Sequence, residues 1–323
     1  MKKLLSILMV GAIAAFLAAC GNGDGTESPE ESGNEGSSGE GVTGEVAIDG
    51  SSTVFPIMEA VSEEYSIQEG GVNAPVGVSG TGGGFEKFIN GETDIQNASR
   101  PVSEEEKELL EENGIEYTEF EIAYDGLSVV VNPENDFVDY LTTDELASIY
   151  LEDSDVETWA DVREGWPEEE IELYSPGTDS GTYDYFSEVI LDEQAINRDA
   201  SLSEDDNVLV QGVQGSPNAI AYFGYAYYIE NQDNLNIVPI ENSEGEKVKP
   251  SPETIQSGEY EPLSRPLYVY VNNESIQNNE AVYEYMKFAL ENAGTLAEEV
   301  GYIALSEEAY NEQLNKLDEI AGK

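Results

Sequence analysis

Beyond about residue 45, short apolar or β-branched runs alternate with stretches in which apolar residues recur every three or four positions. Runs of the first kind are typical of strands, and stretches of the second kind are typical of amphipathic helices. Strands are predicted at residues 46–48, 73–78, 94–98, 117–123, 127–131, 171–174, 237–240 and 267–271. Helices are predicted at residues 55–65, 85–90, 103–113, 143–150, 182–191, 280–292 and 306–319. This alternation predicts an α/β fold in which helices cover a mainly parallel sheet.

The first 44 residues follow a different pattern. Two lysines precede an apolar run at residues 4–16 that is shorter than a membrane-spanning helix, and Cys20 follows small residues at its end. This arrangement resembles a bacterial lipobox and predicts a lipoprotein signal peptide at 1–19, with Cys20 as the lipid attachment site. The alternative is an ordinary signal peptide with an incidental cysteine. Residues 20–44 are rich in Gly, Glu, Ser and Asn, which predicts a disordered, lipid-anchored tether.

The composition excludes several classes of function. The chain has 68 acidic and 13 basic residues, no histidine and a net charge of −55, so no basic surface for nucleic acid is expected. Such acidity is typical of an exported protein from a saline or alkaline habitat, and an acidic surface for a specific partner is the alternative. Cys20 is the only cysteine, which excludes an internal disulfide. Without clusters of His or Cys we expect no metal and no cofactor.

Three segments rich in Ser, Thr and Gly carry the candidate chemistry. They lie at residues 50–56, 79–85 and 177–183, and each leads from an apolar run into a stretch with helical periodicity. At such a turn, unpaired backbone N–H groups, the positive end of the helix dipole and side-chain hydroxyls point the same way. One turn of this kind is weak evidence, because Ser and Thr are ordinary N-caps. Three in one chain predict an oxyanion held among helix N-termini.

Together with Asn97-Ala98-Ser99-Arg100-Pro101, these turns resemble the phosphate-binding (PstS-type) substrate-binding proteins of ABC importers. The segments 205–213 and 223–227 also match, so the resemblance extends from about Val46 to the C-terminus. It implies a bilobed type II periplasmic-binding-protein fold, with two α/β lobes joined by two crossover strands and the ligand in the cleft. Lobe 1 is then expected at residues 45–123 and 267–323, and lobe 2 at residues 124–266.

The resemblance also implies the ligand-binding residues. Matched to the motifs of the family, the candidates are Ser52, Thr53, Val54, Ser79, Thr81, Arg100, Asp179, Ser180, Gly181 and Thr182. Thr53 supplies a hydroxyl, Val54 a backbone N–H, and the Ser-Gly-Thr segment supplies hydroxyls and amides to a tetrahedral dianion.

Two positions depart from the pattern of the better-known members. Arg100 stands where those members have an Asp that accepts the proton of hydrogen phosphate, and Pro176 stands where they have an Arg. We therefore expect Arg100 to give phosphate a bidentate fork, so that Arg100→Ala cripples binding; a surface ion pair is the alternative. Asp179 and Asp125 are candidate acceptors for the ligand proton, and turn-forming or capping roles are equally open.

The predicted function is that of a non-enzymatic, lipid-anchored receptor on the extracytoplasmic face of the membrane. It captures inorganic phosphate as a monomer and delivers it to ABC permease subunits. Alternatives are a receptor for sulfate, molybdate or another oxyanion, and a sensor or adhesin. An esterase or phosphatase using Ser180 or Ser52 lacks a histidine base and a Gly-x-Ser-x-Gly elbow. The tyrosine-rich run at 221–228 is typical of packing, with a ligand-lining role as the alternative.

Overall fold

The structure is a computed structural model that describes residues 41–178 and 180–323. The predicted signal peptide, the lipid attachment site Cys20, most of the tether and the candidate Asp179 lie outside the described residues. Within the described part, no helix combines the length and the apolar character that crossing a bilayer requires.

The main sheet has eight strands and runs through both halves of the described chain. Its order is β2 (Ile48–Gly50), β4 (Ile95–Ala98), β13 (Ser264–Asn272), β5 (Tyr117–Val131), β9 (Ala219–Gly224), β7 (Glu172–Pro176) and β8 (Ser201–Ser203), with β10 (Asn236–Ile237) paired to β5. The strands at its two ends pair in parallel, but β4–β13, β13–β5 and β5–β9 are antiparallel. The expectation of a mainly parallel sheet is therefore wrong at the centre.

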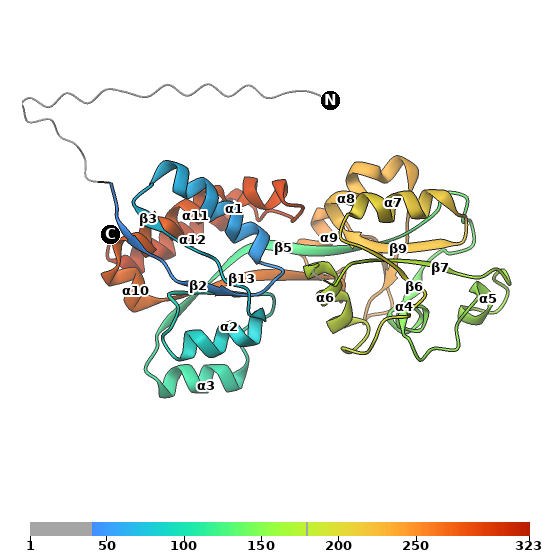
Figure 1. The fold of residues 1–323 in the computed structure, drawn as a ribbon, viewed down its shortest axis with the longest axis horizontal. Coiled ribbons are helices and arrows are strands. Elements are labelled where there is room, and N and C mark those ends of the chain that lie inside the picture. The colour runs from blue at the N-terminus through green and yellow to red at the C-terminus, as the bar shows by residue number, and fades with distance from the viewer. Residues whose placement is uncertain (1–40, 179) are drawn as a thin grey trace, which may run out of the picture. The chain divides into compact units, whose positions relative to one another are not determined.

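The long strands β5 and β13 explain this mixed sheet. The strands expected at 117–123 and 127–131 are one strand, β5, which leaves lobe 1 and enters lobe 2. Strand β13 brings the chain back, so the two must run in opposite directions when they pair. Figure 1 shows β5 and β13 side by side between two groups of helices. Their register places Asp125 opposite Arg265.

The helices divide between the two lobes. Lobe 1 contains α1 (Phe55–Gln68), α2 (Gly80–Ile89), α3 (Glu104–Glu112), α10 (Asn273–Asn278), α11 (Glu280–Glu299) and α12 (Glu307–Ala321). Lobe 2 contains α4 (Thr143–Tyr150), α5 (Trp159–Val162), α6 (Gly181–Val189), α7 (Asp206–Gly215), α8 (Tyr225–Asn231), the 3-10 turn Gln232–Asn234 and α9 (Pro252–Gln256). Helices α5 and α7 to α10 were not predicted, and α2 begins five residues earlier than expected.

Short strands complete the fold. Strand β1 (Gly44–Glu45) pairs with β3 (Val72–Asn73), and β6 (Leu141–Thr142), β11 (Ile240–Glu241) and β12 (Lys247–Val248) form a three-stranded sheet. The strand expected at 73–78 is reduced to β3 and one bridge at Val76, and the strand expected at 237–240 is split between β10 and β11.

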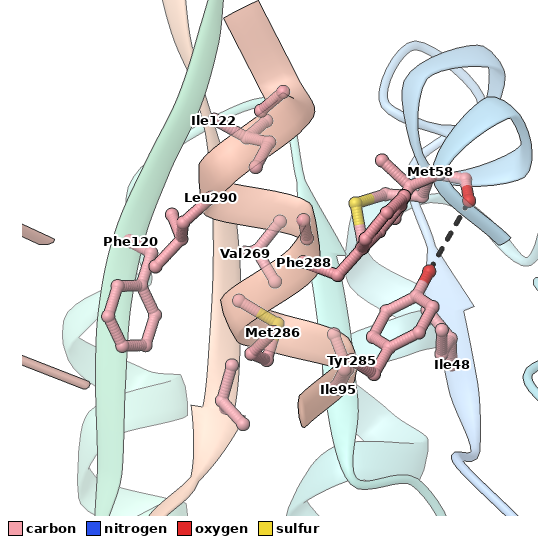
Figure 2. Packing of buried hydrophobic residues seen from close by; sticks show 14 of the residues in the cluster. Ile48, Met58, Ile95, Phe120, Ile122, Val269, Tyr285, Met286, Phe288 and Leu290 are labelled. Carbon is pink, nitrogen blue, oxygen red and sulfur yellow. Dashed lines mark hydrogen bonds between the residues drawn. The ribbon is translucent and has the colours of Figure 1, made fainter. Parts of the chain in front are cut away.

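Each lobe has its own hydrophobic core. In lobe 1, α11 packs over the sheet through Met286 and Leu290, and Tyr285 turns toward α1, where its hydroxyl donates to the Met58 carbonyl at 3.4 Å (Figure 2). In lobe 2, Phe186 of α6 stacks on Tyr222 of β9 with ring centroids 3.7 Å apart. These buried rings fix the start of α6, and with it one wall of the cleft, relative to the sheet.

The tyrosine-rich run at 221–228 forms β9 and α8. Tyr222 and Phe223 are fully buried, which confirms packing as their role. Tyr227 is partly exposed and lines a cavity between the lobes.

Candidate anion-binding cleft

The first Ser/Thr turn joins β2 to α1 and faces lobe 2. It begins at Gly50, whose φ of 140° and close approach to the Asn97 backbone exclude any side chain. Ser51 Oγ then accepts a bond from the Thr53 N–H at 3.2 Å. Val54 is fully buried at the N-cap of α1. The turn therefore presents Ser52 and Thr53 to the cleft.

Thr53 and Ser52 touch lobe 2 directly. Thr53 Oγ1 donates to the Gly181 carbonyl at 3.4 Å, and Ser52 Oγ donates to Asp184 Oδ2 at 2.9 Å. A Cβ atom on Gly181 would lie 2.8 Å from Thr53 Cα, so this close approach requires glycine. The first turn and the start of α6, distant in sequence, are thus brought together as the sequence motifs predict.

The second turn splits into two parts. Thr81 lies in the first turn of α2 and faces Ser99, with the two hydroxyl oxygens 3.1 Å apart. Ser79 points elsewhere and donates to Asp49 Oδ1 at 2.5 Å, beside Lys87. Burial opposes ionisation of Asp49, but these bonds from Lys87 and Ser79 keep the pKa of Asp49 below its usual value. Ser79 therefore supports the turn from outside the cleft.

Arg265, a buried cation from β13, reaches the first turn. Its Nη2 donates to Thr53 Oγ1 at 3.0 Å and its Nη1 to Glu188 Oε2 of α6 at 3.1 Å. The guanidinium lies over the Tyr185 ring, 3.5 Å from the centroid. Only 9 % of Arg265 is exposed. Thr53 is therefore positioned by a cation that sequence reasoning did not assign to the site.

Asp125 faces Arg265 across the two crossover strands. Its Oδ2 lies 3.6 Å from Arg265 Nε, too far for a hydrogen bond, and neither atom has another partner among the described residues. Burial raises the pKa of Asp125 despite the neighbouring guanidinium. This pair is a buried ion pair with incomplete hydrogen bonding.

Arg100 lies at the edge of the cleft, and its guanidinium is already engaged. Nη1 and Nη2 donate to the two carboxylate oxygens of Glu106 at 2.8 Å each, and this bond is the main reason that the pKa of Arg100 is raised. The charge of Glu188 also acts on Arg100. The bidentate fork expected for phosphate is made to Glu106, which is the ion pair that the sequence left as the alternative.

The third turn caps α6. Ser180 Oγ accepts from the Thr182 N–H at 3.2 Å and serves as the N-cap. Ser180, Gly181 and Thr182 are partly exposed, on the opposite side of the Thr53–Gly181 contact from Arg265.

Two cavities flank this contact. The first, which we call the arginine pocket, has a volume of about 330 Å³ and is lined by Ser51, Ser52, Thr53, Gly80, Thr81, Ser99, Arg100, Asp184, Ser187, Glu188, Glu193 and Arg265. The second, the acidic pocket, has a volume of about 460 Å³; its polar lining includes Ser52, Asp125, Ser180, Thr182, Glu204, Asp206, Tyr227 and Tyr302. The predicted site residues are thus divided, with Ser52 lining both pockets.

The acidic pocket suits an anion poorly. Burial, together with the charges of Asp205 and Glu204, raises the pKa of Asp206 to about 6. A larger cavity of about 700 Å³ lies at the ends of α2 and α3, beside α10; it contains none of the predicted residues and is lined by Asn, Gln, Gly, Ile and Glu residues. In the described part of the chain, no group of His, Cys, Asp and Glu side chains has an arrangement that could hold a metal ion.

Comparisons with known proteins identify the family of the chain. Residues 35–293 match the family described as a PBP superfamily domain. The chain is 45% identical to the phosphate-binding protein PstS of Staphylococcus saprophyticus over 325 residues, covering 100% of this chain and 97% of that protein. The chain belongs to the PstS-type phosphate-binding proteins.

Two further proteins extend the comparison. Protein SphX of Synechococcus elongatus is 47% identical over 267 residues, covering 82% of this chain and 79% of SphX. The crystal structure of a possible phosphate binding protein from Planctomyces limnophilus is 44% identical and superimposes with a TM-score of 0.83, covering 86% of this chain and 99% of that one. The bilobed periplasmic-binding-protein fold expected from the sequence is therefore confirmed.

Sequence reasoning did not single out three charged residues that line the arginine pocket: Arg265, Asp184 and Glu188. Arg265 left one signal, because it is a charged residue two positions before the apolar run at 267–271 in a chain with four arginines. The two carboxylates left none, since acidic residues are everywhere on the helix surfaces of this chain.

Proposed function

We propose that this protein is an extracytoplasmic receptor that binds inorganic phosphate between its lobes and delivers it to the permease subunits of an ABC transporter. The observation that carries the proposal is the arginine pocket. It gathers hydroxyls from three segments of lobe 1 and two guanidinium groups in a chain whose net charge is −55. The PstS-type relatives support phosphate as the ligand.

The chemistry of the pocket suits a tetrahedral dianion. Each phosphate oxygen accepts more than one hydrogen bond, and Thr53, Thr81 and Ser99 offer neutral donors beside a positive charge. Ser52 joins this set from the contact between the lobes, whereas Ser180, Gly181 and Thr182, which the sequence also proposed as ligand-binding residues, line the acidic pocket. Val54, at the start of α1, is fully buried and lines neither pocket, so it is left out of the proposed site. We leave Ser79 out of the proposed site because it lines neither pocket.

We also propose that the receptor is a monomer held at the outer face of the membrane through a lipid on Cys20. The positive start, the apolar run and the position of the cysteine support this anchor. The polar residues between the cysteine and the folded part give the receptor reach to meet a permease.

Binding without catalysis is favoured by the state of the two candidate nucleophiles. Ser180 Oγ caps α6, and Ser52 Oγ donates to the carboxylate of Asp184, while the chain has no histidine to act as a base.

Calorimetric titration of the purified protein with phosphate, sulfate and molybdate tests the proposal. We expect phosphate to bind and to resist displacement by a hundredfold excess of sulfate. Preferential binding of sulfate or molybdate would assign the cleft to another oxyanion, and absence of binding by all three would overturn the proposal.

A further inference from the structure

We propose that Arg265 is the anion-binding cation of the cleft and that the carboxylate of Glu188 occupies it until the substrate oxyanion takes its place. This inference rests on the proposed function and names the residues that decide affinity at the same site. It transfers the role expected of Arg100 to an arginine on the strand that joins the lobes.

The placement of Arg265 is the first argument. Its guanidinium donates a hydrogen bond to Thr53 Oγ1 and packs on the Tyr185 ring. The same side chain lines the arginine pocket. Burial lowers the local dielectric and strengthens its interaction with an anion. Arg100 is more exposed, and both of its terminal nitrogens bind Glu106.

The second argument concerns the carboxylates around Arg265. Asp125 is 4 % exposed and lies on the paired crossover strand, so it cannot leave without unfolding the strand pair. Glu188 is on a helix of lobe 2 and its side chain is 49 % exposed. An exposed carboxylate regains its hydration when released, and so Glu188 is the partner that an incoming anion can replace at low cost.

The third argument is that lobe 2 presents further carboxylates to the same donors. Asp184, one helical turn before Glu188, accepts the Ser52 hydroxyl. Glu193 also lines the arginine pocket, and it follows Asp192 in a turn where the two residues have φ values of 58° and 51°. Such backbone conformations are uncommon for residues with a side chain. Lobe 2 therefore places carboxylates against the hydroxyl and guanidinium donors of lobe 1 and the crossover.

A tetrahedral dianion would use these same donors. Glu188 holds a nitrogen of Arg265 and Asp184 holds the hydroxyl of Ser52, and each carboxylate oxygen accepts a bond that a phosphate oxygen would accept. Phosphate must therefore compete with two internal carboxylates. Neutralising either one removes a competitor while leaving every donor of the pocket in place.

Phosphate titration of the wild type, Glu188→Gln and Asp184→Asn at fixed salt tests the inference. We expect Glu188→Gln to bind phosphate about two- to tenfold more tightly than wild type, and Asp184→Asn to change affinity in the same direction by less. Glu112→Gln is the matched control, because it removes one negative charge from the exposed end of α3 and lines no part of the pocket. Its affinity should equal that of wild type.

Repeating the Glu188→Gln comparison in an Arg265→Lys background tests whether Arg265 is the group for which Glu188 and phosphate compete. If Glu188 competes through Arg265, its gain in affinity shrinks when the guanidinium fork is replaced by a single ammonium. Circular dichroism and thermal unfolding verify that each variant is folded. Should the Arg265 variant fail to fold, the comparison of Glu188→Gln with Glu112→Gln decides the question alone.

The outcomes separate this inference from the proposed function. Equal or weaker phosphate binding by Glu188→Gln, in a protein whose wild type binds phosphate, overturns the inference and leaves the receptor function standing. No phosphate binding by the wild type or any variant overturns both.

Discussion

The two pockets on either side of the Thr53–Gly181 contact share a wall but have opposite character. The arginine pocket combines hydroxyls with Arg100 and Arg265, whereas the acidic pocket contains Asp125 and Asp206 beside Glu204. The start of α6, with its N-terminal amides, faces the acidic pocket, while the acidic side chains one and two turns later face the arginine pocket. The same helix thus offers favourable and unfavourable groups to an anion on different faces.

If the anion binds in the arginine pocket, as we propose, a helix N-terminus alone does not locate an anion site. The dipole and free amides contribute modestly, and a buried cation or several nearby carboxylates can outweigh them. In a chain of such negative charge, we infer that the local arrangement around Arg265 decides where an anion binds. Salt screens the distant carboxylates more effectively than it screens groups inside the pocket.

Replacing Arg265 should have the largest effect on phosphate affinity. Arg265→Gln eliminates the positive charge and leaves Asp125 buried without its counter-ion, so we expect phosphate affinity to fall by about a hundredfold or more. Calorimetry measures the affinity, and thermal unfolding measures the accompanying loss of stability. Unchanged affinity in a folded variant would place the anion in the other pocket.

Disrupting the Thr53–Gly181 contact between the pockets should have the second-largest effect on phosphate affinity. Gly181→Ala places a Cβ 2.8 Å from Thr53 Cα and forces the two lobes apart, which we expect to weaken phosphate binding about five- to a hundredfold. Gly215→Ala at the end of α7 is the control, because its Cβ would meet no atom within 4 Å. Equal affinities for the two alanine variants would show that the contact is not needed for binding.

Arg100→Ala should lower phosphate affinity less than Arg265→Gln or Gly181→Ala. Because the guanidinium is partly exposed and already binds Glu106, we expect phosphate affinity to fall only about two- to fivefold. The hypothesis from the sequence predicts that this variant is crippled. A loss larger than that of Arg265→Gln would return the anion-binding role to Arg100.

The smallest effect concerns the acidic pocket and the pH dependence of stability. The pKa of Asp206 is raised to about 6, so between about pH 4 and 6 the folded protein binds more protons at this site than the unfolded chain. The contribution of Asp206 to the free energy of unfolding should fall by about 1–3 kcal/mol as the pH rises through this range, and stay constant above it. Asp206→Asn should remove this slope in thermal unfolding at a series of pH values, without changing phosphate affinity. An identical slope in the variant would contradict the assignment.

Local signals in the sequence predicted the local structure well. The helix predicted at 103–113 forms as α3, with a capping box of Ser103 and Glu106 at its start, and Ser180 caps α6 as the third turn indicates. Of the three Ser/Thr turns, the first and the third meet, since Ser52 and Thr53 contact α6. Such signals depend on residues within one turn of each other, so they can be recognised from the sequence without knowledge of the fold.

The pairing of charges was not predictable in the same way. Glu106 completes its capping box and also binds Arg100, a second role that the box does not reveal. Arg265 and Glu188 are 77 residues apart and meet only because β13 and α6 converge. With acidic residues so abundant, no sequence pattern distinguishes the one carboxylate that meets Arg265 from its neighbours.

The register of the two crossover strands carries a mechanical consequence. Because Asp125 and Arg265 face each other on the strands that link the lobes, they stand close to the pivot about which a rotation of the lobes would turn. During such a rotation, groups near the pivot move little, whereas the side chains on α6 move further because they lie further from it. A rotation that carries Glu188 away would leave the Arg265 guanidinium almost stationary. Separation of the lobes and exposure of the Arg265 charge would then be one movement.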